Sequence, residues 1–118
     1  MNNCIVIIDD NKRQLDGYTK DVINPFNIEA KMKAFGFNTQ TVKGNDLDAI
    51  DEAITKAKSV TDSAVCIVLD TIKGQGVKFF EELLDNHSVK FNTEEVNRAT
   101  DEAKASLKKE IEEEEQHV

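Results

Sequence analysis

Oxygen-bearing side chains follow an apolar run near the start of the sequence. Residues 4–8 have the length and composition of a buried parallel strand, and Asp10 and Asn11 come just after them. In open α/β sheets, ligands bind at the carboxyl ends of the strands, and carboxylate and amide oxygens are ligands that Mg²⁺ and Ca²⁺ prefer. Gly17 then allows the chain to turn sharply away. The sequence therefore predicts a cation-binding strand end at Asp10 and Asn11.

A second apolar run, residues 64–69, also ends in a polar side chain, Asp70. The following segment contains Gly74 and Gly76, which let a backbone approach a ligand closely, and Lys73, which is able to face an anion. The same Gly-x-Gly spacing is also common in ordinary turns. Because parallel strands end at the same edge of a sheet, we expect both strand ends to open on one edge.

Helical patterns separate the strands, and this alternation predicts a parallel sheet with right-handed crossovers. Asn24 is expected to cap a helix that has Pro25 at its first position and ends at Gly36. A weaker strand is predicted over residues 37–42, and residues 44–46 form a turn that caps the next helix. The buried stripe of that helix is expected to consist of Leu47, Ile50, Ile54 and Ala57.

The last part of the sequence, residues 93–118, is predicted to be one helix with an acidic tail. Thr93 is placed to cap this helix, and apolar residues recur along it at helical spacing. The four consecutive glutamates at 112–115 repel one another, so we expect the end of the helix to fray. We group residues 1–118 as a single α/β unit.

Composition limits the possible classes of function. The net charge of −8 argues against general nucleic-acid binding, which needs a basic surface. No apolar run reaches the length of about twenty residues that a membrane span needs, so neither nucleic acid nor membrane is an expected partner. The first residues lack the pattern of a signal peptide, and we expect a cytoplasmic protein. Cys4 and Cys66 lie in strand-like runs and are interpreted as buried free thiols.

Five blocks of the sequence resemble transketolases and follow one another in that family's order. Residues 9–17 resemble the second half of the family's thiamine diphosphate motif, and residues 71–79 resemble a loop that approaches the cofactor. The three shorter blocks are residues 34–37, 44–46 and 86–87. The resemblance extends over almost the whole chain. It implies a three-layer α/β/α fold with a mostly parallel sheet, of which this chain would hold an incomplete half.

The resemblance also implies which residues bind the cofactor and its metal. Asn11 would bind Mg²⁺ through its side-chain oxygen and Arg13 through its main-chain carbonyl, and the metal would hold the diphosphate of thiamine diphosphate. Leu15 matches an apolar position that packs against the cofactor rings. Lys73 lies in the loop near the cofactor. His87 matches a catalytic histidine close to the diphosphate and to the reacting end of the substrate.

Transketolases transfer a two-carbon ketol unit between sugar phosphates, and the resemblance implies this activity for the complete enzyme. The Gly-Asp-Gly that opens the family's cofactor motif is not in the sequence, nor is the domain that contacts the aminopyrimidine ring. We therefore expect the carboxyl half of a cofactor-binding domain, completed by the remaining transketolase segments or by a partner subunit, together with a homodimer mate. Alone, the chain is expected to bind the cofactor weakly and to be inactive.

Two further interpretations stay open. The length, the α/β pattern and the acidic pair Asp9 and Asp10 are also typical of phosphoacceptor receiver domains. In such a domain Asp70 would be phosphorylated and the acidic pair would bind Mg²⁺, but two more strands are needed, and no convincing one follows Val77. The second interpretation is a structural module without its own activity. Its unpaired sheet edge and apolar faces predict self-association or marginal stability.

Overall fold

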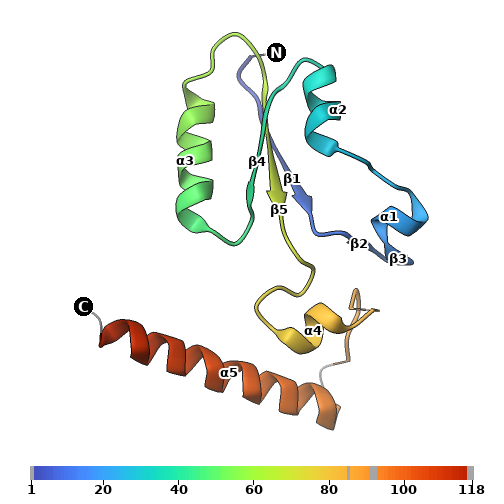
Figure 1. Ribbon diagram of the computed structural model, residues 1–118, viewed down its shortest axis with the longest axis vertical. Coiled ribbons are helices and arrows are strands. Elements are labelled where there is room, and N and C mark those ends of the chain that lie inside the picture. Colours follow the sequence, from blue (N-terminus) through green and yellow to red (C-terminus); the bar gives the residue numbers. More distant parts are fainter. Residues whose placement is uncertain (1, 85, 91–92, 117–118) are drawn as a thin grey trace. The chain divides into compact units, whose positions relative to one another are not determined.

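The computed structural model describes residues 2–84, 86–90 and 93–116. The chain divides into two compact units, Met1–Ile72 and Lys73–Val118. The first unit contains the β-sheet, and the described part of the second contains two helices, α4 and α5 (Figure 1).

The central feature of the first unit is a sheet of three parallel strands. They are β1 (Ile5–Asp10), β4 (Asn38–Lys43) and β5 (Val65–Asp70), and they are arranged in the order β1-β5-β4. The register pairs Asp10 at the end of β1 with Asp70 at the end of β5. The predicted parallel sheet is therefore confirmed, and so is the common edge at which the two polar strand ends open.

Helix α3 (Leu47–Lys58) covers one face of this sheet through two small residues, Ala53 and Ala57, which belong to the same buried cluster as the central strand β5. The predicted cap is confirmed, because the side chain of Asp46 accepts the N–H of Ala49 at 3.0 Å. The prediction for Leu47 is wrong, since this side chain is 80% exposed. At 3.6 residues per turn it points about 100° away from the face that Ala53 and Ala57 bury.

Helix α2 (Ile28–Ala34) lies on the opposite side of the sheet from α3, which gives the expected α/β/α layers (Figure 1). The cap predicted at Asn24 is wrong. Asn27 caps the helix, and its side-chain oxygen accepts the N–H of Ala30 at 2.8 Å. Asn24 accepts the N–H of Phe26 at 2.8 Å instead, and Phe26 has a left-handed φ of 50°. A right-handed helix is therefore able to begin only after Phe26.

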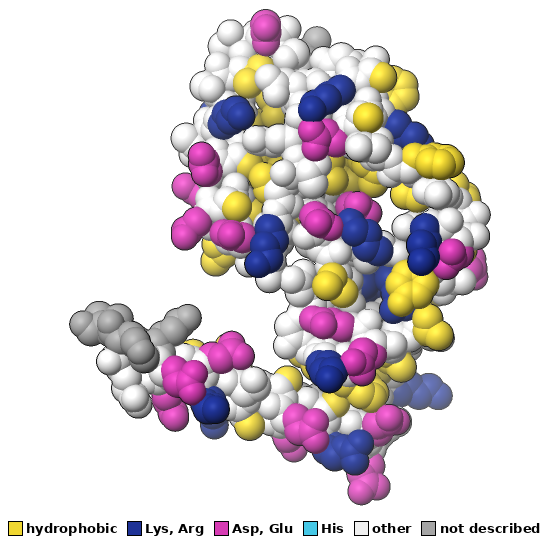
Figure 2. Space-filling model, viewed as in Figure 1, with side chains coloured by type: hydrophobic (Ala, Val, Ile, Leu, Met, Phe, Trp, Pro, Cys, Tyr) yellow, Lys and Arg dark blue, Asp and Glu magenta, His cyan; other side chains and the backbone are white. Residues whose placement is uncertain are grey.

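The two apolar strands differ in how well they are covered. The first four residues of β5 are all buried, which confirms the prediction of a strand covered on both faces. In β1, by contrast, Ile5 and Ile7 are exposed, and Ile7 is 53% exposed. The prediction of a fully buried first strand is wrong because β1 lies at the edge of the sheet, next to β5 alone. Figure 2 shows that apolar side chains also gather at the surface near the segment between α1 and α2.

Between β1 and α2 the chain forms short regular elements. β2 (Arg13–Gln14) and β3 (Gly17–Tyr18) form a short antiparallel hairpin, and α1 (Thr19–Val22) follows it. Gly17 has a φ of 134°, which confirms that the chain needs a glycine to turn here. The hairpin directly follows the polar end of β1, so it fixes the course of the chain after Asn11.

The second unit contains α4 (Lys78–Glu82) and the long helix α5 (Glu94–Glu115). Thr93 caps α5 as predicted, because its hydroxyl accepts the N–H of Val96 at 3.3 Å. Only the first part of the predicted apolar stripe is covered: Val96 and Ala99 are buried, whereas the more distant Leu107 and Ile111 are exposed. Among the described residues, no helix has the length and apolar character needed to cross a membrane.

Candidate functional site

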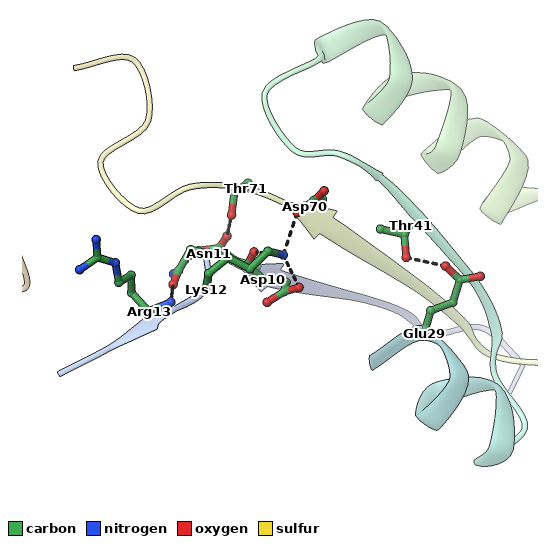
Figure 3. A network of polar contacts seen from close by, with 9 residues as sticks. Asp10, Asn11, Lys12, Arg13, Glu29, Thr41, Asp70 and Thr71 are labelled. Carbon is green, nitrogen blue, oxygen red and sulfur yellow. Dashed lines mark hydrogen bonds and ion pairs between the residues drawn. The ribbon is translucent and has the colours of Figure 1, made fainter. Parts of the chain in front are cut away.

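The carboxyl ends of β1 and β5 are held together beyond the last pair of strand residues. The N–H of Thr71 donates to the carbonyl of Asp10 at 3.3 Å, and the N–H of Gly44 donates to the carbonyl of Asp70 at 2.9 Å. All three parallel strands are thus tied together at this edge. Across this edge, Lys12 pairs with Asp70, and Thr71 donates a hydrogen bond to Asp9. Figure 3 shows Lys12, Asp70 and Thr71 gathered where the strands end.

The amide of Asn11 is oriented by both of its polar ends. Its nitrogen donates to a carboxylate oxygen of Asp9 at 3.0 Å, and its oxygen accepts the N–H of Arg13 at 3.0 Å. The other carboxylate oxygen of Asp9 accepts a hydrogen bond from the hydroxyl of Thr71 on the next strand. These contacts hold the side-chain oxygen of Asn11, which the resemblance assigns to the metal, against the N–H of Arg13. The other group that the resemblance assigns to the metal is the carbonyl of this same Arg13.

Lys12 connects the two strand ends through its ammonium group. Its Nζ forms ion pairs with Asp10 and, at 2.7 Å, with Asp70, and it also donates to the carbonyl of Asp10 at 2.9 Å (Figure 3). Burial alone would lower the pKa of Lys12, but the hydrogen bonds and charges of Asp10 and Asp70 outweigh it and raise the pKa. Lys12 has a left-handed φ of 64°, which is uncommon for a residue other than glycine.

The hairpin anchors the turn from its other side. The N–H of Thr19 donates to the carbonyl of Lys12 at 3.0 Å, and the guanidinium of Arg13 stacks over the ring of Tyr18 at 4.0 Å. Arg13 also donates to the hydroxyl of Tyr18 at 3.1 Å. Leu15 lies between β2 and β3, where its side chain is 63% exposed. An exposed leucine at this position leaves an apolar surface available for a ligand or another segment.

The oxygens at this edge are suited to a hard cation. Carboxylate, amide and main-chain carbonyl oxygens are the ligands that Mg²⁺ and Ca²⁺ take, and Asn11 brings one of them next to Arg13. The amide oxygen of Asn11 has a second lone pair beyond the one that accepts the Arg13 N–H. Across the residues that the structure describes, no group of three or more His, Cys, Asp and Glu side chains has the arrangement of a metal centre. The donors present therefore fit part of a metal's ligand set.

A second group of candidate residues lies in the second unit. The Nζ of Lys73 is 3.4 Å from Nδ1 of His87, so these two predicted site residues are neighbours. The side-chain nitrogen of Asn86 donates to the carbonyl of Lys73 at 3.3 Å and to the carbonyl of Phe80 at 2.8 Å. Asn86 thus ties the loop that carries Lys73 to the segment that carries His87.

Gly74 allows this loop to fold tightly. It has a φ of 82°, and a Cβ atom at this position would lie 2.8 Å from Cβ of Phe80. The glycine that the sequence assigns to a close ligand approach is therefore required by the loop's own packing. A pocket of about 380 Å³ opens beside it, which is within the usual size range of ligand sites. The pocket is lined by Gly74, Phe80, Asn86, His87, Ser88 and Val89.

The predicted site residues thus fall into two sets. Asn11 and Arg13 adjoin one another in the first unit, with Leu15 on the same hairpin, and Lys73 and His87 adjoin one another in the second. Lys12 was not predicted as a site residue. A signal for it is present in the sequence, because two strands predicted to end at one edge both finish in aspartates, and neighbouring carboxylates attract a nearby cation.

The receiver-domain interpretation would require further strands after β5. In residues 73–84, 86–90 and 93–116 the regular elements are the helices α4 and α5. Asp9, Asp10 and Asp70 do come together at one edge, as that interpretation predicts, but Asp10 and Asp70 are paired with Lys12. The described structure therefore lacks the strands that would carry the remaining residues of a phosphoacceptor site.

Comparisons with known proteins support the resemblance to transketolases. Residues 1–114 match the family described as transketolase, thiamine diphosphate binding domain. A 6-deoxy-6-sulfo-D-fructose transketolase subunit from Clostridium sp. (strain MSTE9) is 40% identical over 111 residues, which are 93% of this chain and 38% of that protein. A subunit of the apulose-4-phosphate transketolase from Actinobacillus succinogenes is 31% identical over 104 residues, which are 88% of this chain and 37% of that protein.

A transketolase from Nostoc sp. (strain PCC 7120) is 38% identical over 78 residues, which are 64% of this chain and 12% of that protein. The chain therefore spans 37–38% of the length of the two transketolase subunits, with a smaller share of the Nostoc enzyme. The family match covers both units, from the parallel sheet to most of α5. The chain belongs to the transketolase family, in its thiamine diphosphate binding domain.

Proposed function

We propose that this chain forms the part of a transketolase-type cofactor site that holds the metal and the diphosphate of thiamine diphosphate. The observation that carries the proposal is the orientation of Asn11, whose side-chain oxygen lies next to the main chain of Arg13 at the end of a parallel strand. The chain's membership in the thiamine diphosphate binding family supports the same assignment. A strand end of this kind is where open α/β sheets bind ligands.

In this proposal the side chain of Asn11 and the carbonyl of Arg13 contribute oxygen ligands to Mg²⁺. The hydrogen bond from the Arg13 N–H holds the side-chain oxygen of Asn11 in place. Leu15, exposed on the neighbouring hairpin turn, packs against the rings of the cofactor. The bound thiamine diphosphate supplies the carbon nucleophile of the transfer reaction. The protein's own part is to bind the diphosphate and to exclude water from the ring surface.

We propose that Lys73 and His87 act as a pair within the second unit. Their nitrogen atoms are 3.4 Å apart, and Asn86 fixes the loop between them. The Lys73 ammonium donates hydrogen bonds, and the His87 ring donates or accepts according to its tautomer, so the pair suits the oxygens of a phosphate or of a sugar hydroxyl. We assign His87 to the reacting end of the substrate, where it donates or accepts a hydrogen bond, and Lys73 to the approach of the anionic groups.

We propose that the complete enzyme transfers a two-carbon ketol unit from a ketose phosphate to an aldose phosphate. The relatives named as transketolase subunits support the enzyme class, and their greater length supports further transketolase segments or a partner subunit as the source of the remaining site. A homodimer mate is a further part of the proposal. We further propose a cytoplasmic location, where free thiols such as Cys4 and Cys66 remain reduced.

The test is to isolate the assembly that contains the tagged chain and to measure Mg²⁺-dependent binding of thiamine diphosphate by calorimetry. Asn11→Ala is expected to weaken this binding by about tenfold or more, because it removes an oxygen ligand. Asn97→Ala, which alters an exposed asparagine on α5, is the matched control and should leave the affinity unchanged. Equal affinities for Asn11→Ala and the unmodified assembly would refute the assignment.

The chain alone is expected to bind thiamine diphosphate weakly, because it contributes only some of the ligands in this proposal. Calorimetry on the isolated chain with Mg²⁺ therefore gives a second measurement. Micromolar, magnesium-dependent binding by the isolated chain would contradict the view that other segments complete the site. In the assembly, His87→Ala should lower kcat for ketol transfer while the assembly itself persists.

A further inference from the structure

Every carboxylate at the sheet edge already has a partner from this chain. Asp9 accepts hydrogen bonds from the neutral side chains of Asn11 and Thr71. Asp10 and Asp70 are both bound by the positive charge of Lys12. The carboxylates at this edge therefore have two kinds of partner. Asp9 is bound by neutral donors, whereas Asp10 and Asp70 share one cation.

The surroundings of the Lys12 ammonium resemble the coordination of a metal ion. Its nitrogen contacts three oxygens: a carboxylate oxygen of Asp10, the main-chain carbonyl of Asp10 at 2.9 Å, and a carboxylate oxygen of Asp70 at 2.7 Å. Ca²⁺ binds oxygens at about 2.3–2.6 Å, only slightly closer than these contacts. A divalent ion in place of the ammonium would thus meet two carboxylates and a carbonyl with little rearrangement.

This group of oxygens is reached by solvent mainly on the side of Asp70. The side chains of Lys12 and Asp70 are 46% and 60% exposed, whereas the side chain of Asp10 is 22% exposed. Two carboxylates attract a divalent cation more strongly than a neutral amide and a carbonyl do. Without Lys12, Asp10 and Asp70 would compete with Asn11 and Arg13 for the same metal.

We propose that Lys12 is a positioning residue that blocks this competing cation site. Its ammonium group pairs with the oxygens of Asp10 and Asp70 and prevents a divalent cation from binding them. The cation then binds the oxygens of Asn11 and Arg13. The inference rests on the proposed function, which assigns Asn11 and Arg13 as the metal ligands. It extends that function because it names the residue that determines which oxygens at the edge the metal uses.

The left-handed backbone at Lys12 serves this arrangement. A φ of 64° turns the chain back on itself directly after Asn11, and the Lys12 side chain then reaches the end of the strand that precedes it. Glycine adopts this conformation at no steric cost, but it would leave Asp10 and Asp70 without a cation. Lys12 supplies the cation at this position, although glycine would adopt its backbone conformation more easily.

The test measures Mn²⁺ binding to the full chain, with free Mn²⁺ followed by its electron paramagnetic resonance signal. Lys12→Met is expected to create a site that binds Mn²⁺ about tenfold or more tightly than the unmodified chain does. Lys12→Gly, which suits the positive φ, should show the same gain and covers the case in which Lys12→Met fails to fold. Adding Asp70→Asn to either variant should abolish the gain.

Two controls separate this effect from net charge and from strain. Lys33→Met removes a lysine that pairs with one carboxylate, Glu29, and should leave Mn²⁺ binding unchanged. Lys12→Arg keeps the charge and should block the site as the lysine does. A folded Lys12→Met and a folded Lys12→Gly that both bind no more Mn²⁺ than the unmodified chain would overturn the proposal. That result would leave the cofactor assignment intact, since Asn11→Ala in the assembly tests it separately.

Discussion

At the scale of single residues, Cys66 illustrates how burial controls chemistry. Its side chain has no exposed surface near the start of β5, the central strand of the sheet. This burial raises the pKa of the thiol because the charged thiolate is poorly solvated there. Cys4 lies just before β1 and is only partly buried. The two free thiols of the chain are therefore expected to differ in reactivity, since the thiolate is the reactive form.

We predict that Cys66 resists modification in the folded protein. In a Cys4→Ser variant, a chromogenic disulfide reagent at mildly alkaline pH should release almost no colour until denaturant is added. In a Cys66→Ala variant, Cys4 should react without denaturant. Rapid modification of Cys66 in the folded Cys4→Ser variant would contradict the buried position of this thiol.

Glu29 illustrates a charge that connects two elements. Its carboxylate accepts a hydrogen bond from Lys33 on the same helix. It also accepts one from Thr41 on β4 (Figure 3). The Lys33 and Thr41 hydrogen bonds lower the pKa of Glu29 below its usual value of 4.5. A carboxyl group whose pKa is lowered on folding adds stability above the unfolded-state pKa, and this contribution is lost as the pH falls through the folded-state pKa.

We predict that Glu29→Gln lowers the urea midpoint at neutral pH and that the difference from the unmodified chain shrinks in acid. The shrinkage should begin below about pH 4.5, where Glu29 is protonated in the unfolded chain. Glu52→Gln, which neutralises an exposed carboxyl of α3, should have little effect at either pH. A Glu29→Gln difference that is the same at neutral and at acidic pH would show that the charge makes no contribution.

At the scale of elements, Gly44 determines how closely the end of β4 approaches β5. A Cβ atom at this position would overlap Cγ2 of Thr71 and would lie 3.0 Å from Cβ of Leu69. The N–H of Gly44 also donates to the carbonyl of Asp70, one of the contacts that hold the polar edge together. A larger residue here must therefore separate the strand ends next to the candidate site.

We predict that Gly44→Ala destabilises the chain by about 1–3 kcal/mol, the usual cost of overpacking. The measurement is the free energy of unfolding in urea. Gly36→Ala is a useful comparison, because Gly36 has a φ of 88° but no atom within 4 Å of the added Cβ, so its cost is that of the backbone conformation alone. For Gly44→Ala, amide chemical shifts of Asp70 and Thr71 should also move, whereas Gly36→Ala should leave them unchanged.

The elements also indicate which features of the sequence were predictive. The parallel register and the meeting of Asp10 with Asp70 follow from alternating strands and helices, and both were predicted. The cap of α2 was not, because Asn24 and Asn27 are both good caps and the left-handed φ of Phe26 decides between them. The role of Lys12 was also not predicted, because its contact with Asp10 depends on a positive φ. A lysine in the sequence gives no indication of such a backbone conformation.

At the scale of the whole molecule, the exposed side of β1 is the clearest feature. A run of apolar residues reveals a strand but not its position in the sheet, so the exposure of Ile5 and Ile7 could not be predicted from the run itself. The strand pairs with β5 along one side only. Unpaired edges with exposed apolar side chains are templates for pairing with another chain. In the proposed enzyme, a further transketolase segment would cover this face.

We predict that the chain by itself associates with other copies through the face of β1. Its weight-average mass in sedimentation experiments should rise with concentration, because burial of Ile5 and Ile7 removes apolar surface from water. Ile7→Lys should shift the distribution toward the monomer, since it places a charge in the middle of that face. Leu47→Lys replaces a residue that is more exposed but lies on α3, and it should change the association much less. A chain that stays monomeric at all concentrations, or equal effects of the two substitutions, would show that the β1 face is not the surface through which copies meet.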